Sequence, residues 1–141
     1  MQEISVMKII QLFALITLGM LGGCSIMNQT SDDANLGETS WELISINGTP
    51  VSLGGNAVIQ FDEKDSKVSG IAACNSFGAG YEMLRNTLKF QNIITTKKYC
   101  EGKMDEEDQI ISNLQNVTRY DVKADKLYFY GKDQLLLTYK R

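Results

Sequence analysis

The sequence predicts a mostly β domain of the α+β class, in which about eight short antiparallel strands form a compact, barrel-like sheet with one helix packed against it. Three observations lead to this prediction. Apolar and polar residues alternate over short segments, turn-forming residues separate these segments, and one stretch has helical spacing of its apolar residues. Short strands joined by tight turns pair with their neighbours in antiparallel fashion.

Five strands are expected before the helix and three after it. The first ends at Asn47-Gly48, a dipeptide that favours a tight turn. Residues 62–67 are polar and form a turn, and the glycine-rich stretch 70–80 is expected to contain sharp turns between strands. The expected strands are 41–46, 57–61, 68–73, 81–84, 88–94, 117–122, 126–130 and 134–139.

The expected helix covers residues 105–116. Four acidic residues, at 105–108, open it, where the helix dipole favours negative charge. Ile110, Ile111 and Leu114 then form an apolar stripe at helical spacing, which predicts that one face of the helix covers the sheet.

The first residues have the pattern of a signal peptide. Lys8 supplies the positive charge, and the apolar run 9–21 is about 13 residues long, short of the ~20 that a membrane-spanning helix needs. The run ends in Leu21-Gly22-Gly23-Cys24, which resembles a lipobox. We therefore expect residues 1–23 to be removed and Cys24 to be acylated. The alternatives are an ordinary secreted protein or a buried apolar helix with a chance cysteine.

Residues 24–40 are expected to form the lipidated N-terminus and a flexible tether, because residues 25–40 are polar and have no apolar period. The domain would then occupy residues 41–141. The lipid chains would hold it at a membrane, and the cell envelope is the predicted location, with the outer membrane preferred.

Composition disfavours several classes of function. The net charge of −3 gives the chain no reason to bind nucleic acid. The sequence has no histidine, so it lacks the commonest general base and a common metal ligand. The acidic residues at 105–108 point in different directions on a helix and are expected to be solvated. We predict no catalytic residues, no metal site and no cofactor.

Cys74 and Cys100 are the two thiols that remain once Cys24 is acylated. An exported domain lies in an oxidising compartment, which favours a disulfide between them. Two buried reduced cysteines are the alternative, because spacing alone does not bring two Cα atoms within bonding range.

Aromatic residues gather near the C-terminus. Strand alternation places Tyr128 and Tyr130 on one face of their strand and Phe129 on the other. If the tyrosine face is the outer one, Tyr128 and Tyr130 form the candidate binding surface of the domain.

Several segments, taken in order, resemble the META domain family of heat-shock-type bacterial lipoproteins. The resemblance runs from about Trp41 to Tyr139. It departs from the family at Ala73, where glycine is usual, and at Lys98-Tyr99, where Met-Ala is frequent. It rests on Trp41-Glu42-Leu43, Ile46-Asn47-Gly48, Val68-Ser69-Gly70, Cys74-Asn75-Ser76-Phe77, Gly80-Tyr81, Thr95-Thr96, Cys100, and Glu106 with Leu114, Val117 and Tyr120.

The resemblance implies a compact antiparallel β domain with one helix and without established enzymatic chemistry. It also implies a loose link to envelope stress tolerance. The expected function is therefore that of a non-enzymatic envelope lipoprotein. The alternative is a protein-interaction module, such as a hydrolase inhibitor or an outer-membrane assembly partner.

Overall fold

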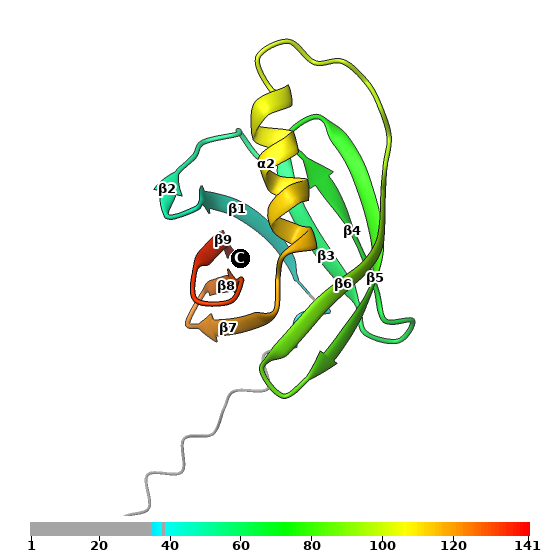
Figure 1. Ribbon diagram of the computed structural model, residues 1–141, viewed down its shortest axis with the longest axis vertical. Coiled ribbons are helices and arrows are strands. Elements are labelled where there is room, and N and C mark those ends of the chain that lie inside the picture. The colour runs from blue at the N-terminus through cyan, green and yellow to red at the C-terminus, as the bar shows by residue number, and fades with distance from the viewer. Residues whose placement is uncertain (1–34, 38) are drawn as a thin grey trace, which may run out of the picture. The chain divides into compact units, whose positions relative to one another are not determined.

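The computed structural model describes residues 35–37 and 39–141 (Figure 1). This part of the chain is mostly β with one helix, which confirms the predicted fold class. Its elements are β1 (Ser40–Ile46), β2 (Thr49–Pro50), β3 (Ala57–Asp62), β4 (Lys67–Ala72), β5 (Asn75–Leu84), β6 (Thr87–Thr95), α2 (Met104–Gln115), β7 (Arg119–Lys123), β8 (Lys126–Tyr130) and β9 (Leu135–Lys140).

The strands form one antiparallel sheet that returns to its own beginning. The order is β2-β1-β3-β4-β5-β6-β7-β8-β9, and β1 also pairs with β9. Leu43 lies opposite Tyr139 and Ile46 opposite Leu137, with a bulge between Leu43 and Ser45. The sheet is therefore ring-like, and the inner side chains of every strand except the short β2 can share one core.

The core follows the predicted alternation of the strands. Trp41, Ile59 and Phe129 are fully buried. Phe61 packs edge-on against Tyr81, with ring centroids 5.3 Å apart and planes at 81°. Edge-to-face pairs of this kind contribute about 0.5–1.5 kcal/mol beyond the area that they bury.

Helix α2 begins one residue before the predicted start and ends one residue before the predicted end. It packs against β4, β6 and β9 at one end of the ring (Figure 1). Its Ile110 and Leu114 are buried, as their spacing predicts. Near its C-terminus, the Asn113 side-chain amide donates to Oδ1 of Asn47, just after β1, at 3.1 Å.

The opposite end of β1 holds the residues just before the sheet. Leu36 is fully buried, and its carbonyl oxygen accepts a hydrogen bond of 3.4 Å from the Trp41 indole nitrogen. The N–H of Gly37 donates to a carboxylate oxygen of Glu63 at 3.0 Å. The packed part of the domain thus starts before Trp41, within the segment predicted as tether, because Leu36 supplies an apolar side chain to the core.

The predicted turns at the glycine-rich stretch are wrong in position. Residues 75–80 belong to β5, and the chain reverses instead at Ala73-Cys74, between β4 and β5. Gly70 lies in β4, where a side chain would collide with the Val58 carbonyl oxygen and the Phe77 ring. Its small size is needed for close packing between strands rather than for a turn.

The alternation of β6 is interrupted by a bulge. Strict alternation from Leu88 predicts Asn92 inside and Ile93 outside, whereas Asn92 is exposed and Ile93 packs against the core. Asn92 has a φ of 51°, and the register with β5 shifts at this point. One extra residue turns each following side chain to the opposite face.

Two buried tyrosines are expected to make the free energy of unfolding fall at alkaline pH. Burial raises the pKa of Tyr139, and burial followed by the Glu63 and Asp62 carboxylates raises the pKa of Tyr81. An unfolded tyrosine ionises near pH 10, so their stabilisation is complete below about pH 10 and is lost as the pH rises toward the folded pKa.

We expect the free energy of unfolding in urea to fall above about pH 10, by up to ~1.4 kcal/mol per pH unit for each tyrosine. Tyr139→Phe should make this fall shallower, because it removes one ionising group. Tyr99→Phe is the control, because the Tyr99 side chain is 82% exposed. A Tyr139→Phe profile that matches wild type would contradict the assignment.

Candidate functional site

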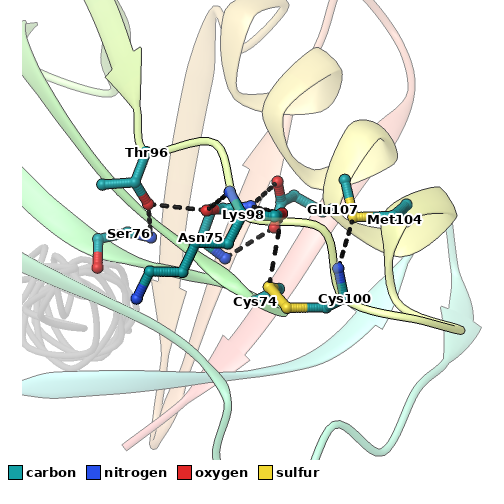
Figure 2. The surroundings of a disulfide bond; sticks show 8 residues. All are labelled: Cys74, Asn75, Ser76, Thr96, Lys98, Cys100, Met104 and Glu107. Carbon is teal, nitrogen blue, oxygen red and sulfur yellow. Dashed lines mark hydrogen bonds between the residues drawn. A yellow bond between two sulfur atoms is a disulfide. The ribbon is translucent and has the colours of Figure 1, made fainter.

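A disulfide joins the corner between β4 and β5 to the loop that leads into α2. Cys74 follows β4 and Cys100 lies in the loop before α2, and their Cα atoms are 6.2 Å apart (Figure 2). This distance is within the usual range for a bridge. The disulfide that the sequence favoured is therefore present, and it ties the β4–β5 corner to the entry of α2.

Asn75, next to the disulfide, connects the same two segments through hydrogen bonds. Its side chain is 1% exposed. Its Nδ2 donates to the Lys98 carbonyl oxygen at 2.9 Å, and its Oδ1 accepts from the Lys98 N–H and the Thr96 hydroxyl, each at 2.8 Å. One amide thus holds the loop after β6 in place on both its donor and acceptor sides.

Glu107 completes this cluster from the first turns of α2. Its carboxylate is buried and accepts the Asn75 main-chain N–H at 2.7 Å and the Asn75 Nδ2 at 2.8 Å (Figure 2). Hydrogen bonds to a charged acceptor are about twice as strong as neutral ones. The contact orients α2 over the end of the ring and explains why a charge is tolerated there.

Sequence reasoning missed this cluster. Adjacent acidic residues on a helix predict a solvated group, and residues 105 and 108 are indeed exposed. Glu107 differs because it lies three residues before Ile110, on the same face of α2. That spacing was the available signal, together with the polar Asn75 directly after Cys74.

The candidate surface of Tyr128 and Tyr130 lies on the outer face of β8. Leu127 and Phe129 are buried between them, as alternation predicts. The two tyrosine rings are half-buried and stacked, with centroids 6.5 Å apart and planes at 26°. Because both rings lie on the outer face of β8, a partner could reach them, and the binding role of Tyr128 and Tyr130 stays a prediction.

Charged side chains of β7 flank this tyrosine pair. The Arg119 guanidinium lies 4.0 Å from the centre of the Tyr130 ring, a cation–π contact. Asp121, opposite Tyr128 in the sheet, pairs with Lys123 at 2.9 Å. Tyr128 and Tyr130 thus also stabilise the sheet through contacts with β7, and these contacts already occupy part of the surface of their rings.

The family of the chain follows from a comparison with known proteins. The profile of the META domain matches residues 34–141. The chain belongs to the META domain family. The match begins just before Leu36, the first side chain that the structure places in the core. No curated protein matches the chain.

Solved structures of other proteins resemble the fold of this chain. One protein solved by NMR is 30% identical, with 74% of this chain and 90% of that chain covered and a TM-score of 0.60. An NMR structure of a protein from Burkholderia xenovorans is 19% identical over 75% of this chain and 83% of its own, with a TM-score of 0.62. A crystal structure of a DUF4847 family protein from Bacteroides vulgatus ATCC 8482 is 12% identical over 75% and 94%, with a TM-score of 0.59. The last two show the fold alone.

The backbone at Ala73 gives a physical reason for the glycine that the family resemblance leads us to expect at this position. Its φ is 63°, in the left-handed region that glycine enters without strain. Ala73 is buried, and the neighbouring disulfide and Asn75 hold the backbone in this turn. An alanine in this region costs about 1–2 kcal/mol, which the packing around it offsets.

The remaining site predictions concern the lipid and metals. Cys24 lies outside the described residues. Across 35–37 and 39–141, no three Cys, Asp or Glu side chains are grouped so as to hold a metal ion. In the same residues no helix has the length and apolar character to cross a membrane.

Proposed function

We propose that this protein is an exported lipoprotein of the bacterial cell envelope, held by acyl chains on Cys24, and that its META domain acts by binding rather than by catalysis. The observation that carries the proposal is the use of the cysteines. The chain has three, and the disulfide takes Cys74 and Cys100. Cys24, at the end of the lipobox-like segment, is left as the thiol available for acylation. A structural disulfide also fits an oxidising compartment outside the cytoplasm.

Acylation of Cys24 gives a direct test. In cells fed a labelled palmitate, wild type should carry the label and Cys24→Ala should carry none, because its side chain offers no thiol to acylate. Ser25→Ala, which changes the neighbouring residue and keeps the thiol, is the matched control and should be labelled like wild type. Mass spectrometry of the N-terminal peptide should find an acylated Cys24 as the first residue. Equal labelling of wild type and Cys24→Ala would refute the anchor.

The membrane that carries the protein is a separate part of the proposal, and we propose the outer one. Separation of inner and outer membranes by density should place wild type in the outer-membrane fraction and Cys24→Ala in neither. Recovery of wild type with the inner membrane would correct the location and leave the anchor intact.

A protein-interaction module is the second candidate, and the outer tyrosine pair favours it. Tyrosine is enriched at protein interfaces because its ring is apolar and its hydroxyl bonds polar groups. A hydrolase or an outer-membrane assembly protein would be the partner on this surface. Crosslinking in cells should capture a specific partner that Tyr128→Ala with Tyr130→Ala no longer captures. We also propose, from the family resemblance, that the anchored domain supports tolerance of envelope stress.

A further inference from the structure

The ring of strands has one weak junction, between β6 and β7. Each other neighbouring pair in the sheet shares at least two residue pairs, whereas β6 and β7 share Thr87↔Arg119 alone. Two hydrogen bonds flank this pair, from Leu88 N–H to the Thr118 oxygen at 3.2 Å and from Tyr120 N–H to the Asn86 oxygen at 3.0 Å. Beyond Leu88, β6 continues to Thr95 without β7 beside it.

The main chain of Phe90 faces this junction. Leu84 and Thr87 close the two-residue turn of the β5–β6 hairpin, so Thr87, Lys89 and alternate residues bond to β5. Leu88 and Phe90 therefore point their N–H and C=O groups to the other side, as the Leu88 bond to Thr118 demonstrates. Among the hydrogen bonds of the described residues, none reaches the Phe90 main chain from that side.

A groove of about 900 Å³ lies along this free edge. Lys89 and Phe90 of β6 line it, together with neutral amides and a hydroxyl from Asn113, Gln115, Asn116, Thr118 and Gln134. The side chains of Asn113, Asn116 and Thr118 already donate hydrogen bonds within the domain. The amides of Gln115 and Gln134 both donate and accept, so they can bond a second chain whose N–H and C=O groups alternate.

We propose that this groove binds an extended peptide segment of a partner protein, which pairs as an added strand with the main chain of β6 at Phe90. An unpaired strand edge presents donors and acceptors at the spacing of another strand, which favours a peptide over a sugar. This inference rests on the binding role proposed above and gives that role a partner of defined chemistry.

The side chains around the groove select the peptide's sequence. Phe90, Val117 and Leu136 line it as apolar groups, so one inward-facing peptide residue is apolar. Lys89 and Lys132 are exposed at the groove, and neither belongs to an ion pair of the described residues. Asp133 is the one acid there. The net positive charge favours an acidic residue beside the apolar one.

The probe is a phage-displayed library of random heptapeptides, panned on the full-length protein in detergent. We expect selected peptides to combine an apolar residue with a nearby Asp or Glu. In a synthetic copy, N-methylation of the one amide that faces β6 should weaken binding about tenfold, because it removes a hydrogen bond. N-methylation of the adjacent amide, which faces away, should change affinity by less than about twofold.

Hydrogen exchange reports the same pairing from the protein side. Saturating peptide should slow exchange of the Phe90 N–H at least about tenfold, since a strand partner now holds it. The Lys89 N–H faces β5 and should change little. Gln115→Trp, an exposed substitution that fills the groove, should abolish binding, and Gln109→Trp, exposed on α2 away from the groove, is its matched control.

Three results would overturn the groove proposal. The first is a library that yields no binder, or binders insensitive to N-methylation. The second is a peptide that Gln115→Trp still binds and that Tyr128→Ala loses, which would move binding to the tyrosine pair and preserve the general binding role. The third is binding of N-acetylglucosamine oligomers in the groove without slowed exchange at Phe90, which would make it a glycan site. None of these outcomes affects the Cys24 test.

Discussion

Asn75→Ala is expected to lower the free energy of unfolding by about 3 kcal/mol. The variant leaves the buried Glu107 carboxylate with one donor in place of two, and it removes the acceptor of the Thr96 hydroxyl and the Lys98 N–H. Urea denaturation followed by circular dichroism measures the loss. Thr96→Val removes two hydrogen bonds to neutral groups, one to Asn75 Oδ1 and one from the Ser76 N–H, and should cost about 2 kcal/mol, which calibrates the larger effect.

Exchanging the amide of Asn75 and the carboxylate of Glu107 tests whether the hydrogen bonds between them cause the loss of stability. Asn75→Asp places a second carboxylate beside Glu107 and should destabilise the domain at least as much as Asn75→Ala, because like charges repel when buried. The double variant Asn75→Asp/Glu107→Gln again has one amide donor facing one carboxylate, with the two positions exchanged. It should therefore recover part of the lost stability. If Asn75→Ala costs no more than Thr96→Val, the contact between Asn75 and Glu107 does not hold α2 in place.

Loss of the disulfide is the second large expected effect. Cys74 and Cys100 are 26 residues apart in the sequence. The chain-entropy treatment of a closed loop of about 27 residues gives ~3.5 kcal/mol of stabilisation, because the bridge restricts the unfolded chain. The double variant Cys74→Ala/Cys100→Ala should therefore unfold at a markedly lower urea concentration than wild type.

The control for this prediction is chemical reduction. A reducing agent should shift the unfolding midpoint of wild type toward that of the double variant and should leave the double variant unchanged. A shift of less than about 1 kcal/mol would mean that the bridge contributes little beyond the hydrogen bonds of Asn75. Both variants test the same corner of the fold, so their effects should not be additive.

The sequence predicted those parts of the domain that depend on local periodicity. Alternation placed Phe129 inside and Tyr128 outside, and helical spacing placed Ile110 and Leu114 on the buried face of α2. These patterns survive because each residue's environment is set by its own strand or helix. The disulfide also followed from cysteine usage once export was inferred.

The missed features depend on contacts between distant segments. Gly78 and Gly80 read as turn residues, yet neighbouring strands hold them in β5. Glu107 read as solvated, yet Asn75, from the β4–β5 corner, supplies its donors. The groove beside Phe90 arises from two strands that diverge, which no pattern within either strand reveals.

The double pairing of β1 determines when the domain can finish folding. β1 joins β3 early in the chain, but its other neighbour is β9, the last strand. Leu43 and Tyr139 are separated by nearly the whole domain, so bringing them together has a high entropic cost and raises the contact order. A nascent chain therefore stays open until its final residues emerge. In the exported lipoprotein that we propose, this late closure would keep the chain unfolded, and so able to pass through a translocation channel, until β9 has been made.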